Sequence, residues 1–314
     1  MYHLATLVPR LRRWTLPVSR DEAVLILAAI NQIFLGIDIY LAHLADQKIQ
    51  PGEWIPVVFG PAAGGLLLLA GLLALWRRQP AAVLATLVFA ASVVVGVLGI
   101  YFHLIRAALP AGPVTYRLTT RLLVWGPPFL GPLMFVLVAL FGISAVWRED
   151  PPDSGRLRLG SRLRIRLPLR KTTVYFLLVG STAMVATISA VFDHARTGWE
   201  NANVWIPTVV GVFTAIVCYG IAVIFTPRWG DLVVYVAAMA AMLVTGLLGV
   251  WFHYQDNVTS RGIIVAERFI RGAPIMAPLL YANVGLFGLV VLLDPRSGSR
   301  RERSGEAVRT PAAG

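Results

Sequence analysis

Charged residues and cysteine are scarce in this chain of 314 residues. Only 14% of the residues are charged, against about 25% in an average soluble domain. Hydrophobic residues make up 57%, and the mean hydropathy is +0.71. This composition excludes a soluble cytosolic enzyme, a disordered protein and a disulfide-stapled secreted domain. Cys218 is the single cysteine, so neither an internal disulfide nor a cysteine-ligated metal or iron–sulfur site can form.

Sequence motifs of common enzymes are also missing. The chain contains no Walker A loop, no dinucleotide-binding fingerprint, no His-Glu-x-x-His and no Gly-x-Ser-x-Gly. Its hydrophilic loops are too short to hold a separate catalytic domain. Any chemistry must therefore take place among the apolar segments, and the sequence leaves open whether the protein is an enzyme.

Long apolar runs dominate what is present. A bilayer core of about 30 Å needs roughly 20 apolar residues per spanning helix, and eight runs approach this length. The sequence therefore predicts an all-α polytopic membrane protein with eight transmembrane helices. These helices are expected near residues 24–45, 56–76, 81–104, 126–147, 173–195, 207–226, 231–254 and 275–293.

The two halves of the chain resemble each other. Trp54-Ile55-Pro56 recurs 151 positions later as Trp205-Ile206-Pro207, and the segment 98–103 recurs as 248–253. The Gly-Pro-rich start of the fourth run recurs at the eighth. Each half holds four spans, and an even number of spans makes the repeats parallel, related by an axis along the membrane normal. We therefore expect two parallel four-helix repeats.

These repeats divide the chain into five regions. The predicted regions are a basic N-terminal segment (1–22), a first repeat (23–147), a basic linker (148–172), a second repeat (173–294) and a disordered tail (295–314). The side of the membrane that holds both termini and the linker carries 20 Lys and Arg residues, and the other side carries 8. The positive-inside rule then places both termini in the cytoplasm. The linker's positive charge is assigned to topology and lipid contact, with no nucleic-acid partner.

Four of the five histidines are matched between the halves: His43 with His194, and His103 with His253. Each falls near the outer end of an outward-running span. Diagonal helices of a four-helix bundle lie roughly 11–14 Å apart, given neighbours at about 8–10 Å. Two imidazoles pointing inward could ligate a haem iron across this gap. The alternatives are one metal ion held by all four histidines, proton binding without a cofactor, and hydrogen bonding to backbone carbonyls at helix ends.

Several neighbours could support such a site. Asp38 and Asp193 fall inside spans, where each could orient a histidine. Trp54 and Trp205 are expected to anchor the helices at the outer interface. Carboxylates lie near the histidines in both halves, but none occupies matched positions, which argues against a duplicated histidine–carboxylate metal centre. These carboxylates are Asp38, Asp46, Glu53, Asp193, Glu200, Asp256 and Glu267.

Arginines near the predicted outer helix starts could bind an anionic group such as a haem propionate or a lipid headgroup. Arg121 and Arg268 are the principal candidates, with Arg117 and Arg271 close by. Small residues one turn apart precede the histidines of the third and seventh spans. They permit either close helix approach or room for a cofactor ring. These residues are Gly96, Gly99, Gly246 and Gly249.

Together these motifs resemble a group of uncharacterised bacterial multi-pass membrane proteins with duplicated four-helix units. The resemblance covers roughly residues 30–145 and 180–293, and it departs at Ala273, where the first half has Pro127. It implies residence in the bacterial inner membrane and no particular activity. The residues that carry it are His43, Trp54, His103, Gly126, Pro128 and Pro132.

The leading hypothesis from sequence is a haem b or metal protein of the inner membrane, passing electrons to or from a periplasmic or membrane redox partner. The two haems would be ligated by His43 with His103 and by His194 with His253. A transporter or lipid-handling permease with a pathway between the halves is the second hypothesis. A non-catalytic membrane scaffold, in which histidines and prolines only shape helix ends, is the third.

Overall fold

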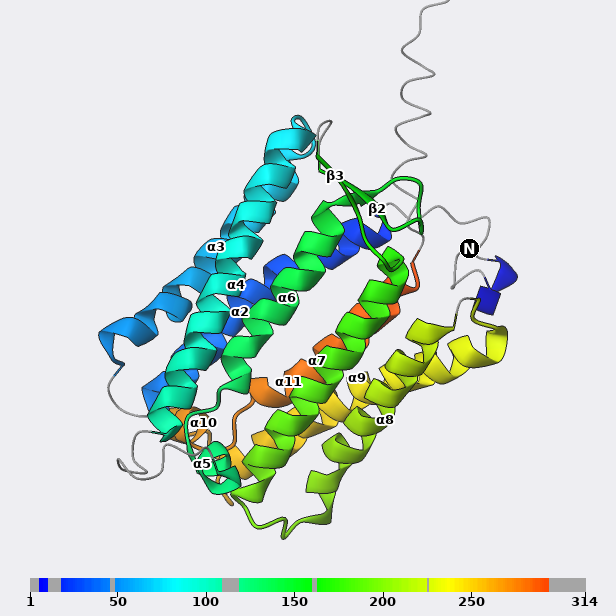
Figure 1. Cartoon of the computed structure of the whole chain (residues 1–314). Coiled ribbons are helices and arrows are strands. Elements are labelled where there is room, and N and C mark those ends of the chain that lie inside the picture. The colour runs from blue at the N-terminus through cyan, green and yellow to red at the C-terminus, as the bar shows by residue number, and fades with distance from the viewer. Residues whose placement is uncertain are drawn as a thin grey trace, which may run out of the picture.

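The computed structural model describes residues 6–10, 18–45, 49–108, 119–159, 163–224 and 226–293. It is mostly helical (Figure 1). The principal helices are α2 (Arg20–Ala45), α3 (Trp54–Leu73), α4 (Arg78–Ala108), α6 (Leu130–Val146), α7 (Lys171–Ala195), α8 (Trp205–Val223), α9 (Trp229–Asn257) and α11 (Met276–Val291). The short helices are η2 (Pro51–Glu53), α5 (Thr120–Trp125), η4 (Ala202–Val204) and α10 (Ala266–Arg271).

Every predicted apolar run contains one principal helix. Six of these helices are long and apolar enough to cross a membrane, whereas α6 and α11 are shorter, with 17 and 16 residues. Helix α6 begins four residues later than expected, after Pro127-Pro128, since proline has no N–H for a helical hydrogen bond, whereas α11 begins one residue later than expected. By helix length and composition, the chain is a multi-pass helical membrane protein.

Helix contacts fall into two rings of four. In the first half, α2 packs on α3, α3 on α4, α4 on α6 and α6 on α2; in the second half, α7, α8, α9 and α11 follow the same order. The first and third helices of each ring therefore lie diagonally opposite. The halves meet where α6 packs on α7 and α11 packs on α2, with α5 against α7 and α10 against α2.

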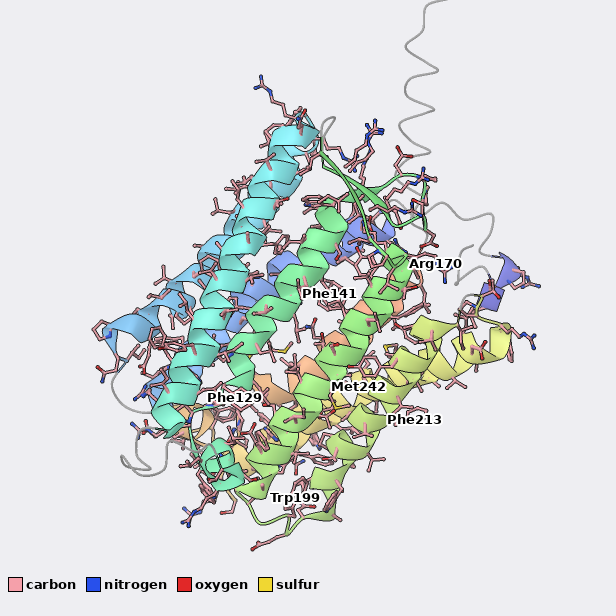
Figure 2. The ribbon with its side chains drawn as sticks, viewed as in Figure 1. Phe129, Phe141, Arg170, Trp199, Phe213 and Met242 are labelled. Carbon is pink, nitrogen blue, oxygen red and sulfur yellow. The ribbon has the colours of Figure 1, made fainter. Side chains whose placement is uncertain are left out.

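Aromatic rings and one amide pair fill the seam between the halves. Phe141 of α6 stacks on Phe287 of α11 with ring centroids 4.6 Å apart, and it also stacks on Tyr175 of α7. Phe141 lies midway along its helix (Figure 2). On the α2–α11 side, Asn31 and Asn283 exchange hydrogen bonds of 3.0 and 2.6 Å. Each amide therefore satisfies the other between apolar helices.

Glycine contacts recur at corresponding positions of the two halves. A Cβ added at Gly99 would lie 2.7 Å from Cβ of Pro132, and one added at Gly249 would lie 2.7 Å from Cβ of Pro278. These glycines let α4 approach α6, and α9 approach α11, more closely than any side chain would permit. Three further pairs of contacts correspond in the same way: Gly142–Phe89 with Gly288–Met239, Gly96–Pro132 with Gly246–Pro278, and Gly60–Gly36 with Gly211–Thr187.

The expected linker at 148–172 contains ordered secondary structure. Strands β1 (Arg148–Glu149), β2 (Arg156–Leu159) and β3 (Leu163–Arg166) form an antiparallel sheet in the order β1-β2-β3. The fold is therefore mostly helical but not all-α, because it contains this small sheet. We call this end of the molecule the hairpin end; α5 and α10 lie at the opposite end (Figure 1). Much of the predicted basic N-terminal segment falls outside the described residues, and so does the predicted disordered tail.

A buried ionic cluster joins the two halves at the hairpin end. Lys171 Nζ donates a hydrogen bond of 2.5 Å to Asp21 and another of 2.9 Å to the Trp147 carbonyl. The Tyr175 hydroxyl donates to the other oxygen of Asp21 at 3.0 Å. Arg20, 1% exposed, donates to a threonine of α7 at 2.6 Å. From the sequence, Arg20 and Lys171 were expected only to set the orientation of the protein in the membrane. In the structure they form the contact between the starts of α2 and α7.

We predict that Asp21→Asn destabilises the protein by roughly 3 kcal/mol, because it leaves the ammonium of Lys171 buried without a counter-charge. Thermal or denaturant unfolding in a mild detergent measures this loss. Asp150→Asn is the matched control, because it breaks an exposed ion pair with Arg158 and should cost about 0–1 kcal/mol. Equal losses for the two variants would contradict the assigned role of the buried pair.

Candidate functional site

The first pair of predicted histidines is brought together. His43 lies in the last turn of α2, and His103 lies near the end of α4, the helix diagonally opposite. Their ring centroids are 6.1 Å apart, with 68° between the ring planes. The two imidazoles thus lie edge to face at the end of the first bundle that is remote from the β-sheet. We call this the histidine end.

Backbone carbonyls orient both imidazoles. His43 Nδ1 donates to the Ile39 carbonyl at 2.8 Å, and His103 Nδ1 donates to the Pro128 carbonyl at 3.1 Å. Because a carbonyl oxygen only accepts, Nδ1 carries the proton in each ring, and Nε2 is left with a lone pair when the ring is neutral. Metal-ligating histidines are commonly held by such a bond. The bond from His103 also ties the end of α4 to the turn that begins α6.

A carboxylate lies beside this pair. Glu53 Oε1 accepts a hydrogen bond of 2.6 Å from Arg106 and lies 4.0 Å from Nε2 of His43. The side chains of Glu53 and His43 are about 15% exposed, whereas that of Arg106 is 57% exposed. The Glu53–Arg106 pair was not singled out from sequence because neither residue has a like-charged counterpart in the second half.

The second half repeats part of this arrangement. His253 Nδ1 donates to the Pro274 carbonyl at 2.8 Å, as His103 does to Pro128. His194 lies close enough to His253 to interact with it electrostatically, and its ring centroid is 6.1 Å from that of Trp199. Trp199 in turn stacks on Trp205 at 4.4 Å.

Trp199 occupies the left-handed backbone region, with φ of 59°. This conformation is unusual for a bulky residue, and it follows Gly198, which also has a positive φ. Stacking on Trp205 holds the ring over the histidine end. Sequence comparison of the halves did not single out Trp199, although Gly198 marks the turn that places it.

Asp38 and Asp193 interact electrostatically with each other across the seam between the halves. Asp193 also interacts with His253, and its carboxylate lies 4.0 Å from Arg196. Both carboxylates were expected to orient histidines from within their own spans. In the structure, the described hydrogen bonds that orient three of the four imidazoles come from backbone carbonyls instead.

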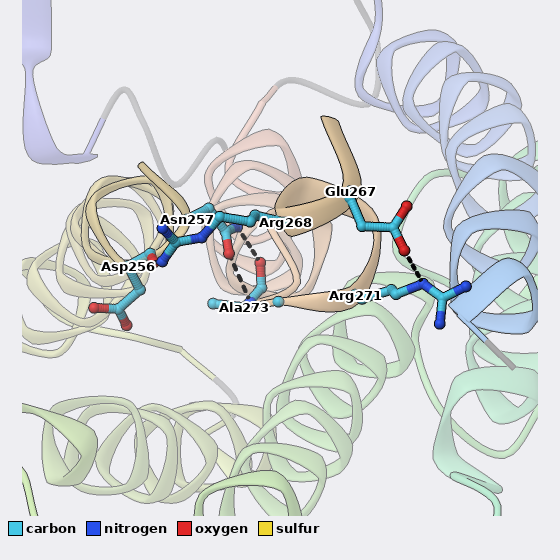
Figure 3. Close-up of a pocket in the computed structure, with 7 residues that line it drawn as sticks. Asp256, Asn257, Glu267, Arg268, Arg271 and Ala273 are labelled. Carbon is cyan, nitrogen blue, oxygen red and sulfur yellow. Dashed lines mark hydrogen bonds and ion pairs between the residues drawn. The ribbon is translucent and has the colours of Figure 1, made fainter. Parts of the chain in front are cut away.

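The candidate anion-binding arginines differ in their surroundings. Arg268 donates to the Asp256 carbonyl at 2.9 Å, and Arg271 pairs with Glu267 at 2.5 Å. They line a shallow hollow of about 310 Å³ (Figure 3). Its floor is closed by Asn257, which exchanges two hydrogen bonds with the backbone of Ala273. These two arginines thus hold a turn together.

Arg121 lies exposed on α5, and Arg117 falls outside the described residues. The indoles of Trp54 and Trp205 are 45% and 50% exposed at the histidine end, as interfacial anchors would be. Gly96 and Gly99 are covered by α6, since a Cβ at either would collide with Pro132 or its neighbours. Of the two explanations considered for these glycines, the structure shows close helix approach.

In the part of the chain that the structure describes, no group of three or more His, Cys, Asp or Glu side chains is placed to hold a metal ion. These residues therefore offer no site for a metal ion that needs three protein ligands. The alternative of one ion shared by four imidazoles is therefore unsupported. A haem iron differs, because the protein supplies only its axial ligands.

Comparison with known protein families, curated proteins and solved structures finds no match to this chain. Neither a family nor an activity can therefore be assigned by similarity.

We predict that Gly99→Ala and Gly249→Ala each destabilise the protein by about 1–3 kcal/mol, because the added methyl group overpacks a filled contact. Unfolding of the purified, unliganded protein measures the change. Gly65→Ala serves as the control: no atom lies within 4 Å of its added Cβ, and the helix should gain up to about 1 kcal/mol. Wild-type stability of the first two variants would mean that the space is open.

Proposed function

We propose that the protein is a bacterial inner-membrane component that binds one haem b in each half and exchanges electrons with a redox partner at its outer surface. His43 with His103 and His194 with His253 are the proposed axial ligands. The observation that carries this proposal is the paired imidazoles of the first half, fixed through Nδ1 with Nε2 left for a ligand. No enzymatic reaction is assigned.

The ring geometry is compatible with two axial bonds to one iron. Two metal–nitrogen bonds of about 2.0 Å, together with the distance from each Nε2 to its ring centre, span a separation close to the 6.1 Å between the centroids. When bound, a haem would supply one-electron chemistry. The protein would contribute the ligands, their carbonyl partners and the nearby Glu53–Arg106 pair, whose charges would influence the reduction potential.

The proposal includes a duplicated architecture of two parallel four-helix repeats, over 23–147 and 173–294. The matched glycine contacts and the two proline-carbonyl bonds from histidine support it. The seam adds independent support. Phe141 and Phe287 occupy equivalent positions 146 residues apart and stack on each other. Equivalent residues meet in this way where a two-fold axis passes between related units.

The proposed orientation places the hairpin end in the cytoplasm and the histidine end outside. It rests on the excess of Lys and Arg at the hairpin end. With this orientation both haems would lie at similar depth near the outer surface. The protein could therefore pass electrons to or from a periplasmic partner, but it would not carry them across the bilayer alone.

The permease alternative has less support in the described structure. Two of the amides that a polar pathway would use, Asn31 and Asn283, are hydrogen-bonded to each other. Gln32 donates to Ser92, while its buried Oε1 has no hydrogen-bond partner among the described residues. The scaffold alternative draws on the bonds from His103 and His253 to proline carbonyls, which would stabilise the turns without a cofactor. Because it makes no demand on Nε2, it predicts a colourless protein.

We predict that the full-length protein, expressed with adequate haem and purified in mild detergent, shows a Soret band corresponding to about two haems per chain. His43→Gln and His194→Gln should each remove roughly half of this absorbance, because each deletes one axial ligand. The double variant should be colourless.

His3→Gln is the matched control, since it removes the histidine that lies outside both pairs. Its absorbance should equal that of the wild type. A wild-type protein without a Soret band and without bound metal by elemental analysis would refute the haem proposal and favour the scaffold.

A further inference from the structure

The β-sheet of the hairpin end separates arginines from apolar residues. Strand register places Arg156 opposite Arg166 and Arg158 opposite Arg164. Leu157 lies opposite Ile165 between these two pairs. Successive side chains of a strand point to opposite faces, so the four arginines share one face and the apolar residues share the other.

The arginine face has an unusual charge pattern. Arg148 of β1 also lies opposite Arg158, so arginines from three strands stand in one row. Like charges directly opposite each other destabilise a sheet. Arg156, Arg164 and Arg166 are exposed, which leaves their guanidinium groups accessible to a ligand.

Nearby acidic residues offset only part of this charge. Asp150 pairs with Arg158 at 2.8 Å. Glu149 points the other way, where its oxygens accept hydrogen bonds from the backbone of Asp153, Gly155 and Lys171. The carboxylate of Asp153 accepts from the hydroxyl of Thr172. The exposed arginine pairs therefore present a surplus of positive charge.

The position of the sheet sets its environment. It begins two residues after α6 ends at Val146, it ends five residues before α7 begins, and β2 contacts α4. Because these apolar helices cross the membrane, the sheet must lie at the level of the lipid headgroups. In Figure 2 nitrogen-tipped side chains gather at this end, near Arg170.

The opposite face of the sheet fits the same location. Leu157 is buried, whereas Leu163 and Ile165 are 47% and 42% exposed. This face therefore packs on the helices through Leu157 and Glu149, and it leaves Leu163 and Ile165 exposed, as in a segment that lies in a membrane interface.

We propose that this arginine face binds the headgroups of anionic phospholipids in the adjacent leaflet. A guanidinium group can donate two parallel hydrogen bonds to one phosphate, so a phosphate placed between facing arginines would satisfy both and relieve their repulsion. The ordered register distinguishes this site from scattered juxtamembrane charge, because it fixes the spacing of the arginines. The proposal is independent of haem binding.

The test is thermal unfolding of the purified full-length protein in neutral detergent, titrated with phosphatidylglycerol. Lipid that binds the folded state stabilises it in proportion to its affinity. We expect Arg164→Gln/Arg166→Gln to weaken the apparent affinity roughly five-fold for each charge removed, since a basic residue near an anionic surface contributes about 1 kcal/mol.

Two variants serve as controls. Arg164→Lys/Arg166→Lys keeps the charge but loses the paired guanidinium hydrogen bonds, so its apparent affinity should lie between those of the wild type and the glutamine variant. A correctly folded lysine variant guards against loss through misfolding. Arg77→Gln/Arg228→Gln removes two exposed arginines from turns at the same end of the molecule, outside the sheet, and should weaken binding less than the hairpin variant.

Three outcomes would overturn the proposal. The first is a phosphatidylglycerol dependence that is unchanged in the hairpin glutamine variant. The second is equal stabilisation by inorganic phosphate at the same phosphate concentration, which would indicate a site for a free anion. The third is tighter binding of a single-stranded RNA oligonucleotide than of lipid, which would indicate a nucleic-acid surface.

Discussion

Polar groups inside a bilayer must find partners within the chain, because hydrocarbon offers no water. This constraint explains most of the specific contacts between the helices. Asp21 is satisfied by Lys171 and Tyr175 at one end of the seam, and Asn31 and Asn283 satisfy each other farther along it. Apolar packing is nearly as favourable against lipid as against another helix, so these few polar contacts fix which helices meet.

Hydrogen bonds within the chain also satisfy polar groups at the histidine end. The imidazoles of His103 and His253 each donate to a backbone carbonyl at corresponding turns, where proline interrupts the helical pattern. A single bond thus stabilises the entry to a short helix and fixes the ring that carries Nε2. Structural and ligand-binding roles for these residues are therefore compatible.

Apolar run length was enough to locate all eight helices, and comparison of the halves was enough to find the histidines, because both patterns are local. Pro127 and Pro128 delay the start of α6, and run length alone does not show this effect. The sheet at 148–166 was missed, although Arg and apolar residues alternate in it with the period of a strand, because its runs of four residues fall within the expected basic linker. The Asp21–Lys171 and Glu53–Arg106 contacts depend on helix packing and join residues 150 and 53 positions apart.

The seam is not symmetric outside its central ring pair of Phe141 and Phe287. At the position 151 residues after Asn31 the chain has Thr182, whose hydroxyl bonds to Leu178 of its own helix, and at the position equivalent to Asn283 it has Leu137. Among the described residues, the hydrogen-bonded pair of amides is therefore found on the α2–α11 side of the seam and not on the α6–α7 side. In a homodimer every substitution appears twice. Under the proposed duplication, fusion into one polypeptide would let each half change alone, and the single amide pair is a difference of this kind.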